Sequence, residues 1–359
     1  MLRESDIQAS CTRLGFELSG VCDVQPSAWA EHYRAWLHAG KHGTMEYLAR
    51  NTELRSDPEL LLPGAQSAIM VADLYHSRGH ESEDVSPARD APVGKIARYA
   101  RGRDYHKVMK KRLHTLCDEL RAQHPGAEFR AFVDTAPLME REIAQLAGLG
   151  WIGKHTLLIH PRVGSFMLLG GILTTLQIAK SSEAITDHCG TCTRCIDACP
   201  TDAITPYSVD ASRCISYLTI ENRGPIDSRF HEAIGDWLYG CDICQEVCPH
   251  NSPRPAGTVV GEIHSEYSPR RESLPLLEVL RWTNDDRANA FAGTAMTRAT
   301  LAMMKRNAVI VAGNAIRNGC ADPDRANLLQ RLKELASDPS DSAELATLAA
   351  ETLRHLHSE

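Results

Sequence analysis

The sequence predicts a chain of three parts: an α/β domain over residues 1–178, a compact cysteine-rich domain over 179–255, and a linker with an α-helical tail over 256–359. Three observations lead to this prediction. Eight of the twelve cysteines lie between residues 189 and 248. Apolar runs typical of strands precede them, and helical periodicity follows them. The 359 residues are enough for two domains, or for one large domain with an appendage.

The α/β prediction for the first part depends on four short strand patterns. Residues 67–73 are apolar and follow a Pro-Gly turn signal, and residues 128–133 alternate between apolar and polar as a half-buried strand does. Two further apolar runs, 157–159 and 166–173, are also expected to be strands. Apolar residues at helical spacing predict a helix over 138–149, with a proline in its first turn and a glycine at its carboxyl end.

The tail is expected to be helical. Residues 301–318 form one predicted helix, residues 327–337 a second, and apolar residues from Leu345 to Leu356 mark a third. Asp322-Pro323 offers a capping residue and a first-turn proline to the second helix. The spacing resembles one and a half repeats of the HEAT kind, whose period is ~40–47 residues. Such a unit cannot bury its own apolar face, so we expect the tail to dock on the rest of the chain.

The middle part contains two cysteine runs typical of bacterial ferredoxins. The first is C-x2-C-x2-C-x3-C-P from Cys189 to Pro200, in which the fourth cysteine binds the other cluster. The second run, from Cys241 to Pro249, lacks its leading cysteine, and Cys214 is the obvious replacement. Thiolates are soft, anionic ligands that suit iron–sulfur cores. We therefore predict two 4Fe–4S clusters, one bound by Cys189, Cys192, Cys195 and Cys248, and the other by Cys199, Cys214, Cys241 and Cys244.

Two zinc sites are the competing interpretation, because C-x2-C pairs also bind zinc. Two successive C-x3-C-P endings favour clusters. The other four cysteines, Cys11, Cys22, Cys117 and Cys320, are scattered, and for each we favour the role of a small buried apolar residue. Since the clusters need only a short chain, we expect the first domain to hold a substrate or a second cofactor.

Composition and the first residues favour a cytoplasmic protein. The first ten residues carry charges and no apolar core, unlike a signal peptide. No stretch approaches the ~20 apolar residues of a membrane span. In a reducing compartment, twelve cysteines are more often metal ligands or catalytic groups than disulfides. The net charge of −7 argues against a uniformly basic nucleic-acid binder but allows a local basic patch.

One such patch is the run from Lys95 to Arg112. It contains eight basic residues and one acidic residue, Asp104. The run fits a solvated helix face. It fits equally well a contact with phosphates, on a cofactor or on a nucleic acid. The residues themselves favour neither interpretation.

Several blocks of the sequence resemble the epoxyqueuosine reductase family, which performs the last step of queuosine synthesis on tRNA. The resemblance covers nearly the whole chain. Its specific blocks are RYARGRDYH at 98–106, FVDTAPLMER at 132–141, GLGWIGK at 148–154, the cysteine runs, and CISYLTIE at 214–221. Together these blocks are far more specific than the cysteines alone, which many electron carriers share.

The resemblance implies a monomeric cobalamin enzyme with a reductive-dehalogenase-like first domain. The corrin would lie between that domain and the ferredoxin-like domain, base-off and with no protein ligand to cobalt. A nearby cluster would reduce cobalt to Co(I), a nucleophile that would attack an epoxide carbon of the modified base at the tRNA wobble position. The oxygen would leave as water, in a reduction that takes two electrons and two protons. A low-potential flavodoxin or ferredoxin would supply the electrons.

The resemblance also implies roles for single residues. Asp134 matches the family's proton donor, a role that needs a raised pKa, whereas the competing interpretation is an ordinary helix-capping aspartate. Cobalamin contacts are expected from Arg55, Tyr99, Asp134, Lys154, Ser216 and Arg223. Contacts with tRNA are expected from Arg141, Arg101, Arg103, Lys107, Lys110 and Lys111. His155 departs from the family pattern, which has asparagine there.

Three other functions stay open on the sequence. Another corrinoid iron–sulfur reductase, such as a reductive dehalogenase, would share the cofactors, but no twin-arginine export signal opens this sequence. A non-catalytic two-cluster electron-transfer protein would not need the large α/β domain. A flavin reductase with added clusters is disfavoured because no G-x-G-x-x-G follows a predicted strand.

Overall fold

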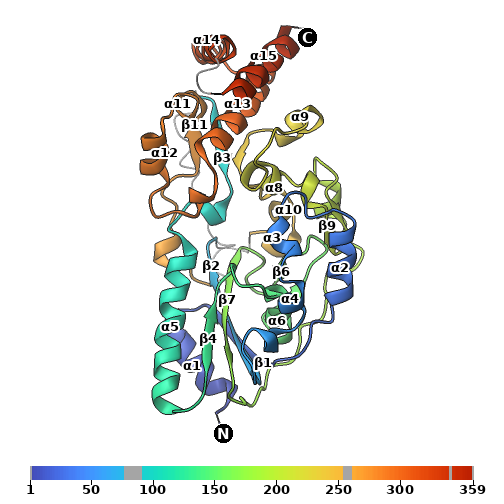
Figure 1. Ribbon diagram of the computed structural model, residues 1–359, viewed down its shortest axis with the longest axis vertical. Helices are drawn as coiled ribbons and strands as arrows, with labels where there is room; N and C mark the ends of the chain where they lie inside the picture. Colours follow the sequence, from blue (N-terminus) through green and yellow to red (C-terminus); the bar gives the residue numbers. More distant parts are fainter. Residues whose placement is uncertain (1, 77–90, 254–260, 339–341, 358–359) are drawn as a thin grey trace.

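A four-stranded antiparallel sheet forms the centre of the amino-terminal half. The computed structural model describes residues 2–76, 91–253, 261–338 and 342–357. Figure 1 shows an elongated molecule, with this sheet at one end and the helical tail at the other. The strand order is β1-β2-β7-β4. The strands are β1 (Leu18–Asp23), β2 (Ser67–Leu74), β7 (Met167–Thr174) and β4 (Phe129–Phe132).

Strand β2 is buried along its whole length because helices cover both faces of the sheet. Successive side chains of a strand point to opposite faces. Ile69 and Val71 accordingly pack in one apolar cluster with residues of α1 (Glu4–Arg13) and α5 (Tyr105–Gln123). Met70 and Ala72 pack in another with residues of α6 (Glu140–Leu146). The sheet thus holds α5 and α6 on opposite faces, and both helices begin near the same end of β4.

All four predicted strands of the first domain are confirmed, as β2, β4, β6 (Leu158–Ile159) and β7. Strand β6 pairs with β5 (Trp151–Ile152) outside the main sheet. The helix predicted over 138–149 is shorter, because Met139 is its N-cap and the glycines that follow leave the helical region. Gly148 has a φ of +76° and Gly150 a φ of +150°. Strand β1 was not predicted.

A second sheet joins all three predicted segments. Its order is β10-β3-β11, from β10 (Trp237–Tyr239), β3 (Val93–Ile96) and β11 (Ser273–Pro275). One apolar core contains Ile96, residues of the cysteine-rich segment and residues of the tail. The predicted boundaries at 178/179 and 255/256 therefore do not separate independent cores, because strand pairing is long-range and leaves no local signal. The second boundary itself lies outside the described residues.

The remaining elements are short except in the tail. The first half also has α2 (Ala30–His38), α3 (Glu46–Ala49) and α4 (Thr52–Ser56). The cysteine-rich segment has α7 (Arg194–Asp197), β8 (Ile204–Thr205), β9 (Ser208–Val209), α8 (Ile215–Ile220), α9 (His231–Ile234) and α10 (Ile243–Glu246). The tail has α11 (Leu276–Val279), α12 (Asn284–Phe291), α13 (Leu301–Arg317), α14 (Asp324–Ser337) and α15 (Ala343–His357). Single 3-10 turns include η2 (Arg98–Ala100) and η7 (Ala295–Arg298).

The three predicted helices of the tail are confirmed as α13, α14 and α15. The predicted cap of the second is wrong, because Pro323 itself is the N-cap of α14 and no side chain caps that helix. Helix α13 is buried from Met303 to Asn314 and packs against both β10 and α8. The tail therefore docks on the cysteine-rich segment, as expected of a helical unit that cannot bury its own apolar face. Its assignment as a HEAT-like repeat stays a prediction.

Buried polar side chains of α13 fix the cysteine-rich segment in place. Arg306 donates to the carbonyl oxygens of Leu218 and Asn222, each at 2.7 Å. Asn307 donates to the carbonyl oxygens of Thr219 at 2.9 Å and Leu238 at 3.0 Å. Both side chains are buried. These bonds satisfy carbonyl groups at the end of α8 and in β10 that water does not reach.

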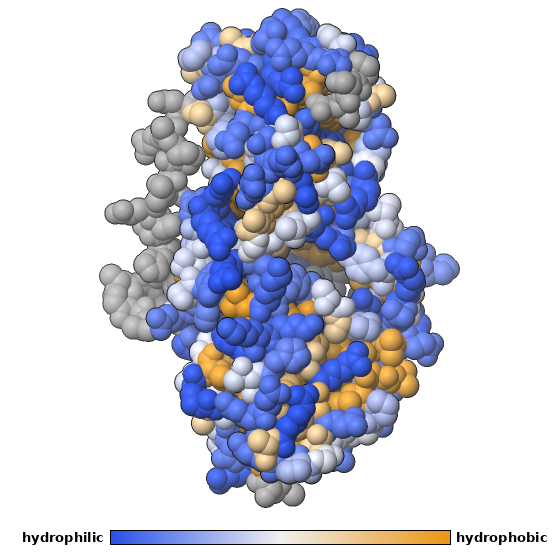
Figure 2. Space-filling model, turned by 60° about the vertical axis from the view of Figure 1, so that its left-hand side comes forward, coloured by the Kyte–Doolittle hydropathy of each residue, from blue (hydrophilic) through white to orange (hydrophobic). Residues whose placement is uncertain are grey.

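The surface is mostly hydrophilic. Figure 2 shows one face on which hydrophilic residues cover most of the area and apolar residues emerge in smaller areas between them. Among the described residues, the exposed large apolar side chains are Tyr47 at 39% and Leu60 at 53%. None of the helices in the described ranges is both long enough and apolar enough to cross a membrane.

Arg306→Met is expected to lower the free energy of unfolding by about 3 kcal/mol, because it leaves buried carbonyl oxygens without a donor. Urea denaturation followed by circular dichroism measures the change. Arg325→Met, on the exposed side of α14, is the matched control and is expected to stay within ~0.5 kcal/mol of the parent protein. Equal effects of the two substitutions would contradict the role given to Arg306.

Candidate functional site

The eight cysteines of the two ferredoxin runs gather into two groups. In the first group, burial raises the pKa of Cys195 to about 11, together with the negative charges of its neighbours Cys248, Cys189 and Cys192. These four thiols are thus close enough to repel one another as thiolates. They are the four that the sequence assigns to one cluster.

The second group contains the other four thiols. Burial raises the pKa of Cys241, and the nearby Cys214 and Cys199 raise it further. The pKa of Cys244 lies well above its ordinary value for the same reasons, with Cys241 and Cys214 beside it. Cys195 of the first group also acts on Cys244, so the two groups are neighbours. Such a crowd of thiols is stable as thiolates only when a metal centre compensates the charge, since a coordinating thiol is deprotonated.

Backbone N–H groups point at several of these sulfur atoms. Cys199 Sγ accepts from the Ala203 N–H at 3.3 Å. The N–H groups of Ser216 and Tyr217 bond to Cys214 and oppose the rise in its pKa.

No group of three or more His, Cys, Asp and Glu side chains in the described ranges could hold a single metal ion. Each thiol of a 4Fe–4S cubane binds a different iron, so cluster ligands are spaced more widely than ligands of one ion.

Asp134 lies just past the carboxyl end of β4, in the loop that leads to α6. Its φ of +51° places it in the left-handed region, which an aspartate adopts at some cost and which is often found at functional sites. Its side chain is 60% exposed. Met139 is the N-cap of α6, so the interpretation of Asp134 as a helix cap is wrong.

His106 connects Asp134 to Asp104. Its Nδ1 lies 2.8 Å from Asp104 Oδ1, and its Nε2 lies 3.1 Å from Asp134 Oδ2. Asp104 is also the N-cap of α5, where its side chain accepts from the His106 N–H at 3.1 Å. One aspartate therefore starts the helix and orients the imidazole. This arrangement of acid, imidazole and acid is suited to holding and passing a proton.

The charges of this triad favour a proton on the imidazole. Burial alone would lower the pKa of His106, but its bonds to Asp134 and Asp104 raise it above the ordinary value. Partial burial likewise pushes the pKa of Asp134 upward, but the hydrogen bonds from His106 and Tyr105 and the charge of Arg141 bring it below the ordinary value. The expectation of a raised pKa for Asp134 is therefore wrong in this structure. His106 is the reason, and it was not among the predicted site residues.

Glu140, the first residue of α6, is a second acid at this place that sequence reasoning missed. Burial raises its pKa to about 8, and the negative charge of Asp134 adds to the effect. The sequence feature that could have identified Glu140 is its position in the block 132–141, six residues after Asp134. The site therefore combines an aspartate whose pKa is lowered with a glutamic acid whose pKa is raised.

Three tyrosines connect Asp134 with the second cysteine group. Tyr105 hydrogen-bonds to Asp134, and the ring of Tyr99 lies 6.3 Å from that of Tyr105. Tyr99 in turn bonds to Tyr239, which is two residues before Cys241. Tyr99, a predicted cofactor contact, thus lies between the triad and the second group.

The other predicted cofactor residues are spread around this region. Ser216 is half-buried in α8, and Arg223 reaches the Arg298 carbonyl oxygen at 3.4 Å. Lys154 Nζ donates to the carbonyl oxygens of Gly190 at 2.7 Å and Cys192 at 3.0 Å, in the loop of the first cysteine group.

Arg55 has a different environment from the other predicted contacts. Its Nε atom is buried and has no hydrogen-bond partner among the described residues. Its charge acts on Glu140, so it lies at the edge of the Asp134 site. A buried N–H without an acceptor is costly unless a ligand supplies one.

The predicted tRNA contacts divide into two kinds. Arg101 is directed inward, where it donates to the Ile96 carbonyl oxygen at 2.9 Å and pairs with Glu272 at 3.6 Å. This placement removes Arg101 from the predicted basic surface. Arg103 is exposed but pairs with Glu266 at 2.7 Å. The exposed cations on the first two turns of α5 are Lys107, Lys110 and Lys111.

Arg141 is exposed beside the site. Its guanidinium donates to the carbonyl oxygen of Thr156 at 2.8 Å and to the hydroxyl oxygen of that residue at 3.2 Å. It is close enough to Asp134 to lower the pKa of that carboxyl group. The part of Arg141 in tRNA binding stays a prediction.

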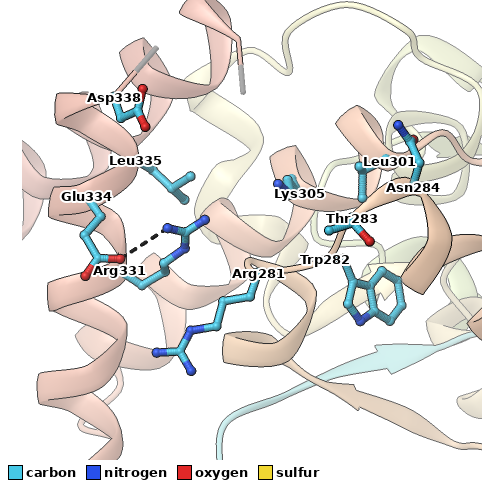
Figure 3. A pocket seen from close by; sticks show the side chains of 10 residues that line it. All are labelled: Arg281, Trp282, Thr283, Asn284, Leu301, Lys305, Arg331, Glu334, Leu335 and Asp338. Atoms are coloured by element: carbon cyan, nitrogen blue, oxygen red, sulfur yellow. Dashed lines mark hydrogen bonds and ion pairs between the residues drawn. The ribbon is translucent and has the colours of Figure 1, made fainter. Parts of the chain in front are cut away.

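A separate hollow of about 700 Å³ lies in the helical tail, and no predicted site residue lines it. Figure 3 shows Arg281, Lys305 and Arg331 at this hollow, with Arg331 paired to Glu334. The ion pair between Arg331 and Glu334 measures 3.2 Å.

Four cysteines lie outside the two ferredoxin runs. Cys11, Cys22 and Cys117 are buried as expected, whereas Cys320 is half-buried.

Two family models match parts of this chain. The model described as "4Fe-4S double cluster binding domain" matches residues 188–251. The model described as "Epoxyqueuosine reductase QueG, DUF1730" matches residues 55–135. The first range contains all eight grouped cysteines, and the second contains Asp104, His106 and Asp134.

Known proteins match it over most of its length. The epoxyqueuosine reductase of Pseudomonas aeruginosa is 37% identical over 332 residues, covering 91% of this chain and 88% of that protein. That of Escherichia coli is 37% identical over 84% of this chain and 78% of its own length. A crystal structure of epoxyqueuosine reductase with an epoxyqueuosine-modified tRNA-Tyr stem loop has a TM-score of 0.80 and 25% identity, covering 98% of this chain and 97% of that one.

Cys214→Ser is expected to reduce the iron content of reconstituted protein from about eight to about four atoms per chain, because one of two 4Fe–4S clusters loses a ligand. Iron analysis and electron paramagnetic resonance measure this. Cys320→Ser, outside both groups, should leave the iron content unchanged. If Cys214→Ser retained both clusters, the proposed replacement of the missing leading cysteine would be wrong.

Asp134→Asn is expected to lower the pKa of His106, because the carboxylate that stabilises the imidazolium is removed. In the parent protein His106 should stay protonated to a higher pH than an ordinary histidine. A nuclear magnetic resonance titration of the imidazole nitrogens measures the pKa of His106 in the parent protein and in Asp134→Asn. Asp118→Asn, on the same helix but with an exposed side chain, serves as the control, and an unchanged His106 titration in Asp134→Asn would disprove the coupling.

Proposed function

The chain belongs to the epoxyqueuosine reductase family, and from this premise we propose that it reduces epoxyqueuosine to queuosine at the wobble position of a tRNA anticodon. The observation that carries the proposal is the relationship to curated reductases along most of the chain, together with a proton-holding triad beside the cysteine groups. The reaction removes one oxygen atom from an epoxide and consumes two electrons and two protons. The site must therefore supply protons where the oxygen leaves.

Asp134 delivers the first proton to the leaving oxygen. Before the reaction the proton is held by His106, whose Nε2 is 3.1 Å from Asp134 Oδ2. A shift of this proton to the carboxylate makes Asp134 a momentary acid without a raised resting pKa. Asp104 keeps the imidazole in position through Nδ1 and stabilises its charge. The exposed carboxylate can reach a bound substrate, whereas the imidazole behind it is partly covered.

Two 4Fe–4S clusters supply the electrons one at a time. We assign one to Cys189, Cys192, Cys195 and Cys248, and the other to Cys199, Cys214, Cys241 and Cys244. The mutual effect of the thiols within each group supports this assignment. The tyrosine contacts from Tyr239 to Asp134 favour the second group as the one nearer the reaction, so electrons from a flavodoxin or ferredoxin would enter at the first.

Cobalamin is the second cofactor that we propose. When bound, it supplies a cobalt nucleophile that opens the epoxide. Arg55, Tyr99, Ser216 and Arg223 are the residues that would hold it. The buried Nε–H of Arg55, which has no acceptor in the described protein, fits a large polar ligand with hydrogen-bond acceptors on its rim.

The tRNA would bind across the start of α5. Lys107, Lys110 and Lys111 are exposed on its first two turns, and the helix begins at the Asp134 site. Phosphates of an anticodon loop would therefore meet positive charge next to the reacting base. Arg141 borders the same site.

Asp134→Asn is expected to reduce turnover of epoxyqueuosine-containing tRNA by about 10²–10⁴-fold, the usual contribution of a general acid. Iron content and tRNA affinity should stay close to those of the parent protein, because the side chain is exposed and its backbone hydrogen bonds do not change. Mass spectrometry of the digested tRNA measures conversion. A variant that converts tRNA at the parent rate would remove Asp134 from the reaction.

A further inference from the structure

The carboxyl group of Glu140 lies directly behind Asp134. Glu140 accepts a hydrogen bond from the backbone N–H of Asp134. Its Oε1 atom is buried and has no partner among the described residues. One oxygen is thus anchored at the base of the Asp134 loop while the other has no protein group to bond.

Four charged or titratable groups face Glu140. Asp134 and Tyr105 face it from the β4 end and from α5, and Arg55 and Arg141 face it from α4 and from α6 itself. The two guanidinium groups favour a carboxylate, whereas burial and the negative Asp134 favour the neutral acid and outweigh them. Within the part of the chain that the structure describes, neither arginine forms an ion pair with Glu140, as a buried carboxylate would require. The surroundings are therefore those of a protonated acid.

An unpartnered buried oxygen costs a protein about 1–3 kcal/mol, so a site that keeps one has a use for it. On a neutral acid this atom can carry the proton, and Glu140 then has an O–H with no acceptor in the protein. The negative charge of Asp134 acts on Glu140, and the Asp134 side chain itself reaches the open site. A proton on Glu140 is thus stored one step away from the group that meets the substrate.

We propose that Glu140 is held as a neutral carboxylic acid and supplies the second of the two protons that convert the epoxide oxygen into water. This inference rests on the proposed function. Both carbon–oxygen bonds break and a carbon–carbon double bond forms, with two electrons arriving from the low-potential donor through the clusters. The first proton comes from His106 through Asp134, which returns to the carboxylate form. The second proton then passes from Glu140 to Asp134 and on to the oxygen. Glu140 is left as a carboxylate and His106 as a neutral imidazole, and each regains its proton from solvent.

A merely structural Glu140 would instead hold the Asp134 loop through the backbone bond. Two substitutions separate the roles. Glu140→Gln keeps an oxygen that accepts from the Asp134 N–H but has no acidic proton, whereas Glu140→Leu loses both. Loss of function in both variants indicates proton supply, and loss in Glu140→Leu alone indicates a structural latch.

The first test needs neither substrate nor turnover. Infrared difference spectroscopy of the full-length protein, titrated from pH 6 to pH 10, should show a protonated carboxyl band that disappears around pH 8. The band should be missing in Glu140→Gln. It should persist in Asp134→Asn and disappear at lower pH, because the negative neighbour is gone. A parent spectrum with no band that depends on Glu140 would overturn the inference.

The second test is the pH dependence of a single turnover with epoxyqueuosine-containing tRNA and reduced, reconstituted protein. The parent rate should fall above about pH 8, where Glu140 ionises. Glu140→Gln should be slower by about 10–100-fold and lose the part of the decline that centres on about pH 8, while any decline caused by deprotonation of His106 remains. Glu142→Gln, the same substitution two residues along α6 at a carboxylate bonded to the Ala28 N–H, is the matched control and should keep the parent profile.

The two tests also distinguish the inference from the proposed function. If the parent protein converts tRNA and Glu140→Gln matches it at every pH, the second-proton role is wrong. If the parent protein converts no tRNA at all, the proposed function fails and the second-proton role fails with it, while the infrared band still reports whether Glu140 is the neutral acid described.

Discussion

The ion pair between Arg98 and Asp242 is the contact on which the arrangement of the site depends. Asp242 is 2% exposed, and it accepts from the Arg98 backbone N–H at 2.7 Å and from its guanidinium at 3.3 Å. Arg98 opens the block that continues with Tyr99, Asp104 and His106, and Asp242 lies between Cys241 and Cys244. The pair therefore joins the segment that carries the proton-holding triad to the segment that carries the second thiol group. Removing the Arg98 side chain would leave Asp242 as a buried charge without its cation, which costs about 3–5 kcal/mol.

Single residues also have two roles around the reacting position. Asp104 both caps α5 and orients His106, and α5 then presents its lysines beside the site. The sheet holds α5 and α6 on opposite faces, so that the loop after β4 brings Asp134 between their first turns. The proposed reduction needs two protons, and His106 and Glu140, whose pKa values are both raised, each contact Asp134. In the proposed reaction, protons are thus supplied by His106 and Glu140 in the first turns of α5 and α6, and not by Asp134 alone.

Local sequence patterns predicted a large share of this structure. The cysteine runs could be interpreted because a ligand spacing of two or three residues is itself the geometric constraint. The buried strand at 67–73 and the three tail helices were equally visible, since burial along an element leaves a periodic trace. The family resemblance pointed to Asp134, which the residues alone would have left as a possible helix cap.

Long-range contacts explain what the sequence did not predict. The basic run looked like one surface, yet Arg98, Arg101 and Arg112 are used in interior ion pairs with acids far along the chain. The lowered pKa of Asp134 depends on His106, 28 residues earlier, and no sequence pattern in either segment predicts that contact. The second sheet takes one strand from each predicted segment, which made the proposed boundaries poor guides to the cores.

The most direct measurement is the conversion of epoxyqueuosine-containing tRNA by protein reconstituted without oxygen, with and without added cobalamin, under a strong reductant. Mass spectrometry of the modified nucleoside gives the result. The proposed function predicts loss of one oxygen atom that depends on cobalamin and consumes two electrons for each queuosine formed. No conversion by protein whose two clusters are intact would contradict it.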